Sequence, residues 1–201
     1  MGITERRERE KEEIRRKILD AARELFMTEG YDKVTMRRVA DAIEYSPTTI
    51  YHHFEDKDDL VEALCHEDFA KLLQALDPAQ MPADPIERLR QLGLAYARFA
   101  LQNPNQYRFM FLTPREEHPH PEDSPGYQSF GVVRQMVADA KAAGRLRDDD
   151  VDAMAQTLWA CVHGAVCLVT TFRPEQFPCV PPAPDLVERT VDASIRGLLK
   201  E

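Results

Sequence analysis

The chain has 201 residues, a hydrophobic fraction of 43% and a formal net charge of −9 at pH 7. This length suffices for one or two small domains, and the hydrophobic fraction is that of a globular protein. No apolar run approaches the roughly 18 residues that cross a bilayer, and the charged segment 1–17 does not resemble a secretion signal. The composition therefore predicts a soluble cytoplasmic protein and argues against a secreted or membrane-embedded one.

The acidic excess lies in the later part of the chain. Residues 1–54 contain 11 Lys and Arg against 11 Asp and Glu, so the whole excess of acid falls in residues 55–201. A basic domain is the usual electrostatic footprint of a DNA-binding protein, and this sequence lacks one. If the neutral segment binds DNA, it must use positioned neutral donors and a few directed cations at the phosphates. Such an arrangement favours a site-specific binder over a coating protein.

The four cysteines show no paired metal or redox spacing. Cys65, Cys161, Cys167 and Cys179 contain no C-x-x-C motif, and cytosolic proteins of this size usually keep their thiols reduced. We therefore expect free thiols.

The first thirty residues predict one long helix. Glu alternates with Arg and Lys over residues 4–17, a pattern typical of a solvated helix with pairing between side chains four apart. Apolar residues recur at helical spacing from Ile14 onward, and Gly30 supplies a C-terminal stop. The charged start is interpreted as a solubilising extension of this helix.

Two short helices follow, joined by a turn. Thr35 is a suitable N-cap for the first, and Val34 can pack against Val39 as a hydrophobic staple. Ser46 and Pro47 begin the second, with Ser as the cap and Pro at the first helical position. A helix of about eight residues, a turn of about four and a second short helix is the helix-turn-helix geometry, in which the second helix enters the major groove.

The remaining chain predicts further helices separated by proline-rich segments. The expected ranges are about 55–76, 86–102, a helix after Pro104, 128–143, 148–172 and 185–199. The stretch Thr113–Gly126, which contains His118 and His120, predicts a surface loop. No segment predicts a strand, so the expected fold class is all-α.

The first quarter resembles the TetR family of bacterial one-component regulators. The resemblance rests on Gly30-Tyr31, on 34–40, on 46–54, and on Lys57 with Leu60. It implies a three-helix DNA-binding domain over residues 1–56 and a C-terminal helical bundle over 57–201 that binds a ligand and dimerises. It also implies a ligand-responsive, sequence-specific transcriptional repressor that a small molecule releases from its operator, with no cofactor and no enzymatic activity.

The resemblance assigns roles by position. The implied phosphate contacts are Thr35, Ser46, Tyr51 and Lys57. The candidates for contact with base edges or nearby phosphates are Arg37, Thr48, Thr49 and His52. Pro47 is a further candidate DNA contact.

Two residues of the turn depart from the family pattern. Many family members have Gly where Glu44 stands and a small apolar residue where Tyr45 stands. Glu44 must adopt a left-handed conformation if the turn is kept, and the Tyr45 hydroxyl is a further candidate phosphate contact. Arg37 and Arg38 alternatively form only a solvated face, and His53 lies between core positions and is interpreted as a bridge between helices.

The C-terminal part predicts a dimer and an apolar pocket. The motif Trp159-x-x-x-His163-Gly164 resembles the family's C-terminal domain type with a W-H-G signature, and the late helices 148–172 and 185–199 are the expected dimer interface. Core packing is the alternative for each pocket candidate, His163 included. The candidates share an aromatic, apolar or imidazole side chain: Tyr96, Phe99, Tyr107, Met110, Phe111, Met136, Trp159 and His163.

Three other functions fit these residues less well. A thiol–imidazole enzyme would use Cys167 and His163, four residues apart, but no orienting acid or oxyanion loop is evident. His118 and His120 lack the further ligands of a metal site, so no metal is expected. A ligand-sequestering protein without DNA binding would have lost the four phosphate-contact candidates, all of which are present.

Overall fold

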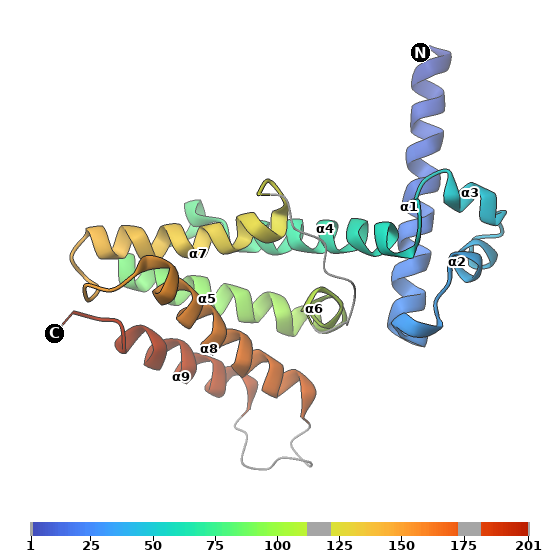
Figure 1. The fold of residues 1–201 in the computed structure, drawn as a ribbon. Helices are drawn as coiled ribbons and strands as arrows, with labels where there is room; N and C mark the ends of the chain where they lie inside the picture. The colour runs from blue at the N-terminus through green and yellow to red at the C-terminus, as the bar shows by residue number, and fades with distance from the viewer. Residues whose placement is uncertain (1, 112–121, 173–181, 201) are drawn as a thin grey trace. The chain divides into compact units, whose positions relative to one another are not determined.

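The computed structural model describes residues 2–111, 122–172 and 182–200, and this part of the chain is helical throughout apart from turns and one isolated bridge, Leu146 to Leu199. The predicted all-α class is therefore confirmed. The elements are α1 (Ile3–Glu29), η1 (Tyr31–Lys33), α2 (Met36–Ala42), α3 (Pro47–Tyr51), α4 (Lys57–Ala75), η2 (Pro78–Gln80), α5 (Pro85–Gln102), α6 (Pro104–Phe111), α7 (Pro125–Ala142), α8 (Val151–Thr171) and α9 (Ala183–Arg196) (Figure 1).

The predicted helix starts follow the capping residues closely. Thr35 accepts a hydrogen bond from the backbone of Arg38, and Ser46 from that of Thr49. The expected start of α7 near residue 128 is wrong, because Ser124 caps the helix and Pro125 occupies its first position, where a missing N–H costs nothing. The end of the predicted surface loop is thus helical. His118, His120 and Cys179 lie outside the described residues.

The chain divides into two compact units. The first contains the residues up to Asp68 together with the end of α6 from Phe109. The second contains Phe69–Arg108 and the described residues from 122 onward. The division falls inside α4, later than the domain boundary expected after residue 56, so that α4 belongs to both units.

The first unit is built on α1. Ile18, Leu19 and Ala22 are buried on its inner face, as are Val39 of α2 and Ile50 of α3. Residues at helical spacing thus bury one stripe of each helix, which is the main source of stability of such short helices.

Polar contacts fasten the first part of α4 to this unit. Asp68 is fully buried, and its carboxylate pairs with the guanidinium of Arg23 of α1 at 2.5 Å. At the start of α4, the Lys57 ammonium donates to the Tyr31 carbonyl at 2.6 Å, and the Tyr31 hydroxyl donates to Asp58 at 2.8 Å. These bonds explain why α4 up to Asp68 belongs with α1 to α3.

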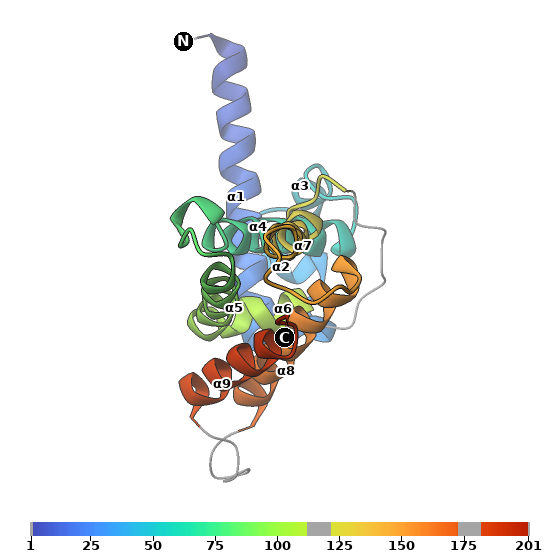
Figure 2. The same ribbon diagram turned by 90° about the vertical axis from the view of Figure 1, so that its left-hand side faces the viewer.

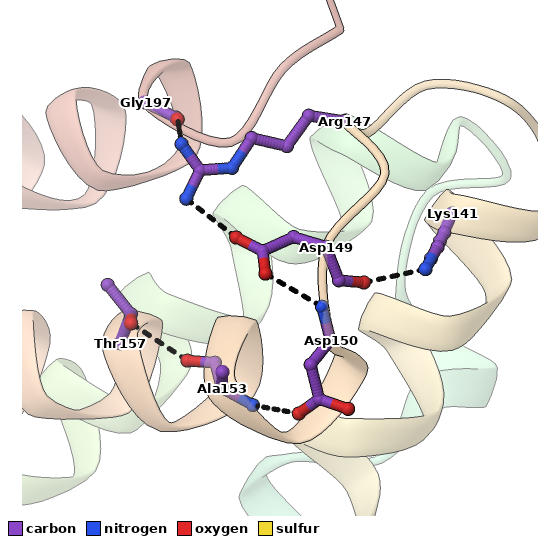
Figure 3. A network of polar contacts seen from close by, with 7 residues as sticks. All are labelled: Lys141, Arg147, Asp149, Asp150, Ala153, Thr157 and Gly197. Carbon is purple, nitrogen blue, oxygen red and sulfur yellow. Dashed lines mark hydrogen bonds and ion pairs between the residues drawn. The ribbon is translucent and has the colours of Figure 1, made fainter.

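The second unit is a bundle in which α8 packs on α9, α7 and α5, and α5 also packs on α7 and α9 (Figure 2). Its α7–α8 turn is tied to the end of α9. Arg147 donates to the Gly197 carbonyl at 3.1 Å and to Asp149 at 2.9 Å, while Lys141 donates to the Asp149 carbonyl at 2.6 Å (Figure 3). Asp150 then caps α8 by accepting from Ala153 at 2.8 Å.

Helix α8 is more apolar than the sequence analysis expects. It has 21 residues, and its most apolar window of 18 has a mean hydropathy of 1.4, which meets the length and composition of a membrane span. The expectation that no run approaches this length is wrong for α8. One such helix is weak evidence for a span, because the core helix of a soluble protein meets the same criterion. Here α8 buries Met154, Leu158 and Val162 within the second unit.

The turn between α2 and α3 contains a strained residue. Glu44 has φ of 59°, in the left-handed region, where a β-carbon is unfavourable. The conformation that the family pattern assigns to Gly is therefore kept by a glutamate. The Tyr45 N–H donates to the Ala40 carbonyl at 3.0 Å and closes the turn.

Replacing Glu44 by Gly should raise the free energy of unfolding by about 1 kcal/mol, because glycine adopts positive φ without a steric cost. Urea denaturation of the protein would measure this change. Glu44→Ala is the matched control, since it removes the same carboxylate but keeps the β-carbon, and it should give no comparable gain. Equal stabilisation by both variants would contradict the strain at this turn.

Candidate DNA interface and ligand pocket

Helix α3 separates apolar anchors from an exposed polar face. Ile50 is fully buried and Phe54 is 2% exposed, whereas Tyr51 is 55% exposed. Thr48 and His52 are exposed as well. Tyr51 is therefore a surface residue, while Phe54 belongs to the core.

The two cap residues keep their hydroxyls at the surface. The Thr35 oxygen accepts from the Arg38 N–H at 3.1 Å, and the Ser46 oxygen accepts from the Thr49 N–H at 3.2 Å. Ser46 and Thr49 also share a hydrogen bond of 3.0 Å between their hydroxyls. Exposed residues here are Thr35, Ser46 and Pro47, while Thr49 is half-buried. Local hydrogen bonds therefore fix the hydroxyls of Thr35, Ser46 and Thr49 near the surface of the helix-turn-helix.

The structure distinguishes the two adjacent arginines of α2. Arg38 pairs with Glu29 of α1 at 2.7 Å, and this carboxylate raises the pKa of the guanidinium. Arg37 is exposed and forms no ion pair within the described part of the chain. Arg37 can therefore bind another group without breaking an ion pair, whereas Arg38 is already paired with Glu29.

Lys57 is partly committed to the protein itself. Its ammonium lies 3.7 Å from the centroid of the Tyr31 ring, in addition to its bond to the Tyr31 carbonyl. Burial lowers the pKa of this ammonium. Lys57 thus holds the segment after Gly30 in place.

Tyr45, the other candidate contact from the turn, is half-buried, and its ring centroid lies 5.9 Å from the ammonium of Lys17.

His53 lies where α1 meets the end of α3. Its Nδ1 atom is buried without a hydrogen-bond partner. Burial lowers the pKa of the imidazole, and the positive charges of Lys11 and Arg15 lower it further. The neutral ring fits the interpretation of His53 as a packing residue.

The second unit contains an apolar pocket that is partly open to solvent, with about 450 Å³ of space that includes its open side. Trp159 and Tyr96 are the only two of the eight predicted pocket residues among its described lining, and every described lining residue is uncharged. Sequence reasoning missed the aliphatic walls, although the helical spacing of Leu89, Leu92 and Tyr96 on α5 was a signal for one of them. The missed lining residues are Leu76, Leu89, Leu92, Gly93, Val133, Leu158, Val162, Val191, Ser194 and Ile195.

Of the other pocket candidates, Phe99, Met110 and Met136 are buried core residues and Phe111 is half-buried. Gly93 instead has a spatial role at the pocket. A β-carbon there would lie 2.9 Å from a methyl of Val191, so the glycine permits the close approach of α9 to α5.

A neutral polar cluster joins the wall of this pocket. The hydroxyls of Tyr96 and Tyr107 lie 2.7 Å and 2.8 Å from Nδ1 of His163, and the Tyr107 hydroxyl lies 3.5 Å from Sγ of Cys167. Burial lowers the pKa of His163 and raises that of Tyr96 to about 12. The imidazole and both hydroxyls are therefore uncharged near neutral pH.

Among the described residues, Cys65, Cys161 and Cys167 are in no disulfide, as expected for these three. The same residues contain no group of three His, Cys, Asp or Glu side chains arranged to hold a metal ion.

A helix-turn-helix with an exposed polar face on its second helix, in a chain with a separate helical bundle, defines a helix-turn-helix transcription regulator. Residues 18–64 match the family model described as bacterial regulatory proteins of the tetR family, and residues 89–194 match the tetracyclin repressor-like C-terminal domain. The chain therefore belongs to the TetR family.

Named relatives agree with this assignment. The chain is 39% identical over 162 residues to the HTH-type transcriptional repressor AcnR of Corynebacterium diphtheriae, covering 76% of this chain and 78% of that one. It is 52% identical over 58 residues to the repressor Rv1474c of Mycobacterium tuberculosis, covering 29% of this chain and 31% of that one. The match to AcnR of Corynebacterium glutamicum, at 32% identity, covers 66% of this chain and 63% of that repressor.

A solved structure of a protein of unknown function from Rhodococcus sp. RHA1 has the same fold. It superposes with a TM-score of 0.78 at 25% identity, covering 92% of this chain and 95% of that one.

Proposed function

We propose that the protein is a cytoplasmic, homodimeric repressor that binds operator DNA through α2 and α3 and leaves it when an uncharged, largely apolar molecule enters the pocket. The observation that carries this proposal is the exposed set Thr48, Tyr51 and His52 on a helix anchored by buried Ile50 and Phe54. A five-residue helix needs only its anchors for packing, so the polar face is free for recognition.

Phosphate contacts hold the module on the duplex. Thr35 and Ser46 use an oxygen lone pair to cap a helix, and a hydroxyl hydrogen can still donate to a phosphate. Tyr51 presents an exposed hydroxyl, and Tyr45 adds a second one from the turn. The Lys57 ammonium has three donors, of which the Tyr31 carbonyl takes one.

Sequence is read by the remaining side chains. Thr48, Thr49 and His52 reach base edges or the phosphates beside them, because short polar donors on a recognition helix face the floor of the major groove. The unpaired Arg37 reaches the same groups from α2. Pro47 at the first position of α3 contacts the sugar–phosphate backbone.

Because its described lining is uncharged, the pocket selects an uncharged ligand. Most of its described lining is aliphatic, and only Tyr96, Trp159 and Ser194 have a polar group in their side chain, so it favours an apolar body with one hydrogen-bonding group. We assign Trp159, His163 and Gly164 to the W-H-G signature of this domain type, in which the tryptophan lines the pocket and the histidine orients Tyr96. Ligand binding then tilts α4, which both units share, and changes the spacing of the two recognition helices.

The exposed side of α8 forms the dimer interface with α9. Ala153, Thr157, Ala160, Gly164 and Leu168 follow one another at intervals of three or four residues, and all are exposed. A β-carbon on Gly164 would meet nothing within 4 Å, so its small size is not required by the protomer's own packing. An uncharged face of small residues beside a buried one lets a second copy approach and explains the apolar character of α8.

DNA upstream of the protein's own gene is the first operator to test, by fluorescence anisotropy of a labelled duplex at low salt, where phosphate contacts are strongest. Tyr51→Phe should weaken binding to all sequences alike, by about tenfold, since it removes one hydrogen bond to a charged acceptor. Thr48→Ala should change the preference between base pairs. Tyr127→Phe, which removes an exposed hydroxyl from α7, is the control and should bind like the parent. Absence of binding at low salt would refute the regulator function.

The pocket's preference can be measured with 1-decanol and decanoate, which differ in charge but not in chain length. Trp159 is the single tryptophan of the sequence and lines the pocket, so its fluorescence reports occupancy. Decanol should bind at least about tenfold more tightly, because a buried carboxylate would find no cation. Val133→Phe should fill the pocket and abolish binding, while the adjacent Val132→Phe should not. Tighter binding of decanoate would contradict the proposed ligand class.

Ala160→Arg should place a charge in the proposed interface and convert the dimer to a folded monomer, measured by sedimentation velocity. Operator affinity should fall with it, because one short helix reads too little DNA alone. Ala142→Arg, an equal substitution on an exposed residue of α7, should leave the dimer intact. An Ala160→Arg protein that remains dimeric would place the interface elsewhere.

A further inference from the structure

The first three turns of α1 pack against nothing in their own unit. Residues 4–13 are all exposed, and the buried face of the helix starts only at Ile18. At about 1.5 Å per residue, this segment extends roughly 15 Å past the packed part of α1. Figures 1 and 2 both show the helix continuing past α3 toward the N-terminus. We call residues 4–17 the α1 extension.

The α1 extension is basic, although the protein as a whole is acidic. It contains seven Lys and Arg against five Glu, a balance of +2, while the whole chain carries −9. Some of its charges are already paired, such as Arg6 with Glu10 and Arg16 with Asp20. Arg7 and Lys11 form no ion pair among the described residues and are exposed.

Arg7 and Lys11 share a helix face with Arg15, because residues four apart lie on one side of a helix. This is the side toward the end of α3. The Arg15 guanidinium lies 5.1 Å from the centroid of the Phe54 ring, and the charges of Lys11 and Arg15 both reach His53. The face toward the recognition helix therefore carries a row of cations that continues outward from it.

The composition of the α1 extension restricts what it can bind. Residues 4–13 contain no apolar side chain. A helix that docks in a protein groove or lies on a membrane needs an apolar stripe, and this one has none. A polyanion, in contrast, can bind a row of unpaired cations without any apolar stripe.

We propose that Arg7 and Lys11 of the α1 extension bind backbone phosphates of the DNA that flanks each operator half-site, beyond the base pairs read by α3. The inference rests on the proposed operator binding. A duplex held by α3 carries about one phosphate charge per 1.7 Å of its axis on either side of the site, so a cationic rod beside the recognition helix meets phosphates there. This contact adds affinity without reading sequence.

The test compares two duplexes with the same operator, one ending at the outer edges of the two half-sites and one extended by ten base pairs on each side. Binding of Arg7→Gln/Lys11→Gln is measured by anisotropy against salt concentration. On the extended duplex, the slope of log affinity against log salt should fall by between about three and four for the dimer, at about 0.9 per lost phosphate contact. On the short duplex the variant should bind like the parent.

Arg6→Gln/Arg9→Gln is the matched control, because it removes two cations from the same three turns on other faces of the helix. It should keep the parent's slope on both duplexes. Equal slopes for the two double variants on the extended duplex would overturn the inference while operator binding itself stands. Failure of the parent to bind either duplex would overturn the proposed function and the inference together.

Discussion

Repulsion between an acidic protein and a polyanion is the constraint on which the remaining features depend. The chain carries −9, yet its recognition module is electrically balanced and all of the acidic excess lies after residue 54. Without a broad positive field, DNA affinity must come from individual donors held in fixed positions. The hydroxyls of Thr35 and Ser46 are held in this way by the helix ends that they cap, and Tyr51 by the burial of its neighbour Ile50.

The same constraint makes the rigidity of the first unit important. A few donors bind phosphates well only if little freedom is lost on binding, so the segment after Gly30 must be fixed beforehand. Lys57 and Asp58 do this by bonding the carbonyl and the hydroxyl of Tyr31. The pair of half-buried Arg23 and fully buried Asp68 fixes α4 to α1, and removing the partner of a buried charge is destabilising. In the proposed function, this helix, which is fixed at one end and continues into the second unit, transmits the ligand's effect.

Much of the fold follows from local rules in the sequence. Capping residues and prolines located the starts of α2 and α3, and the conditional prediction of a left-handed Glu44 is confirmed by its φ of 59°. Features set by contacts between distant residues could not be read in this way. Arg38 forms an ion pair with Glu29 of α1, whereas Arg37 does not. In the bundle, Met136 packs in the core while Val133 lines the pocket, because their side chains point in different directions. Periodicity identifies an inward face, but it does not separate a core from a cavity wall.

In the proposed function, recognition depends on a few positioned side chains in a protein whose remaining charge disfavours DNA. The ratio of affinities for the operator and for a random duplex of equal length, both at physiological salt, tests it most directly. Non-specific binding is almost entirely electrostatic, so the acidic body should suppress it and the ratio should exceed about a thousandfold. A random duplex that binds within about tenfold of the operator would contradict the claim.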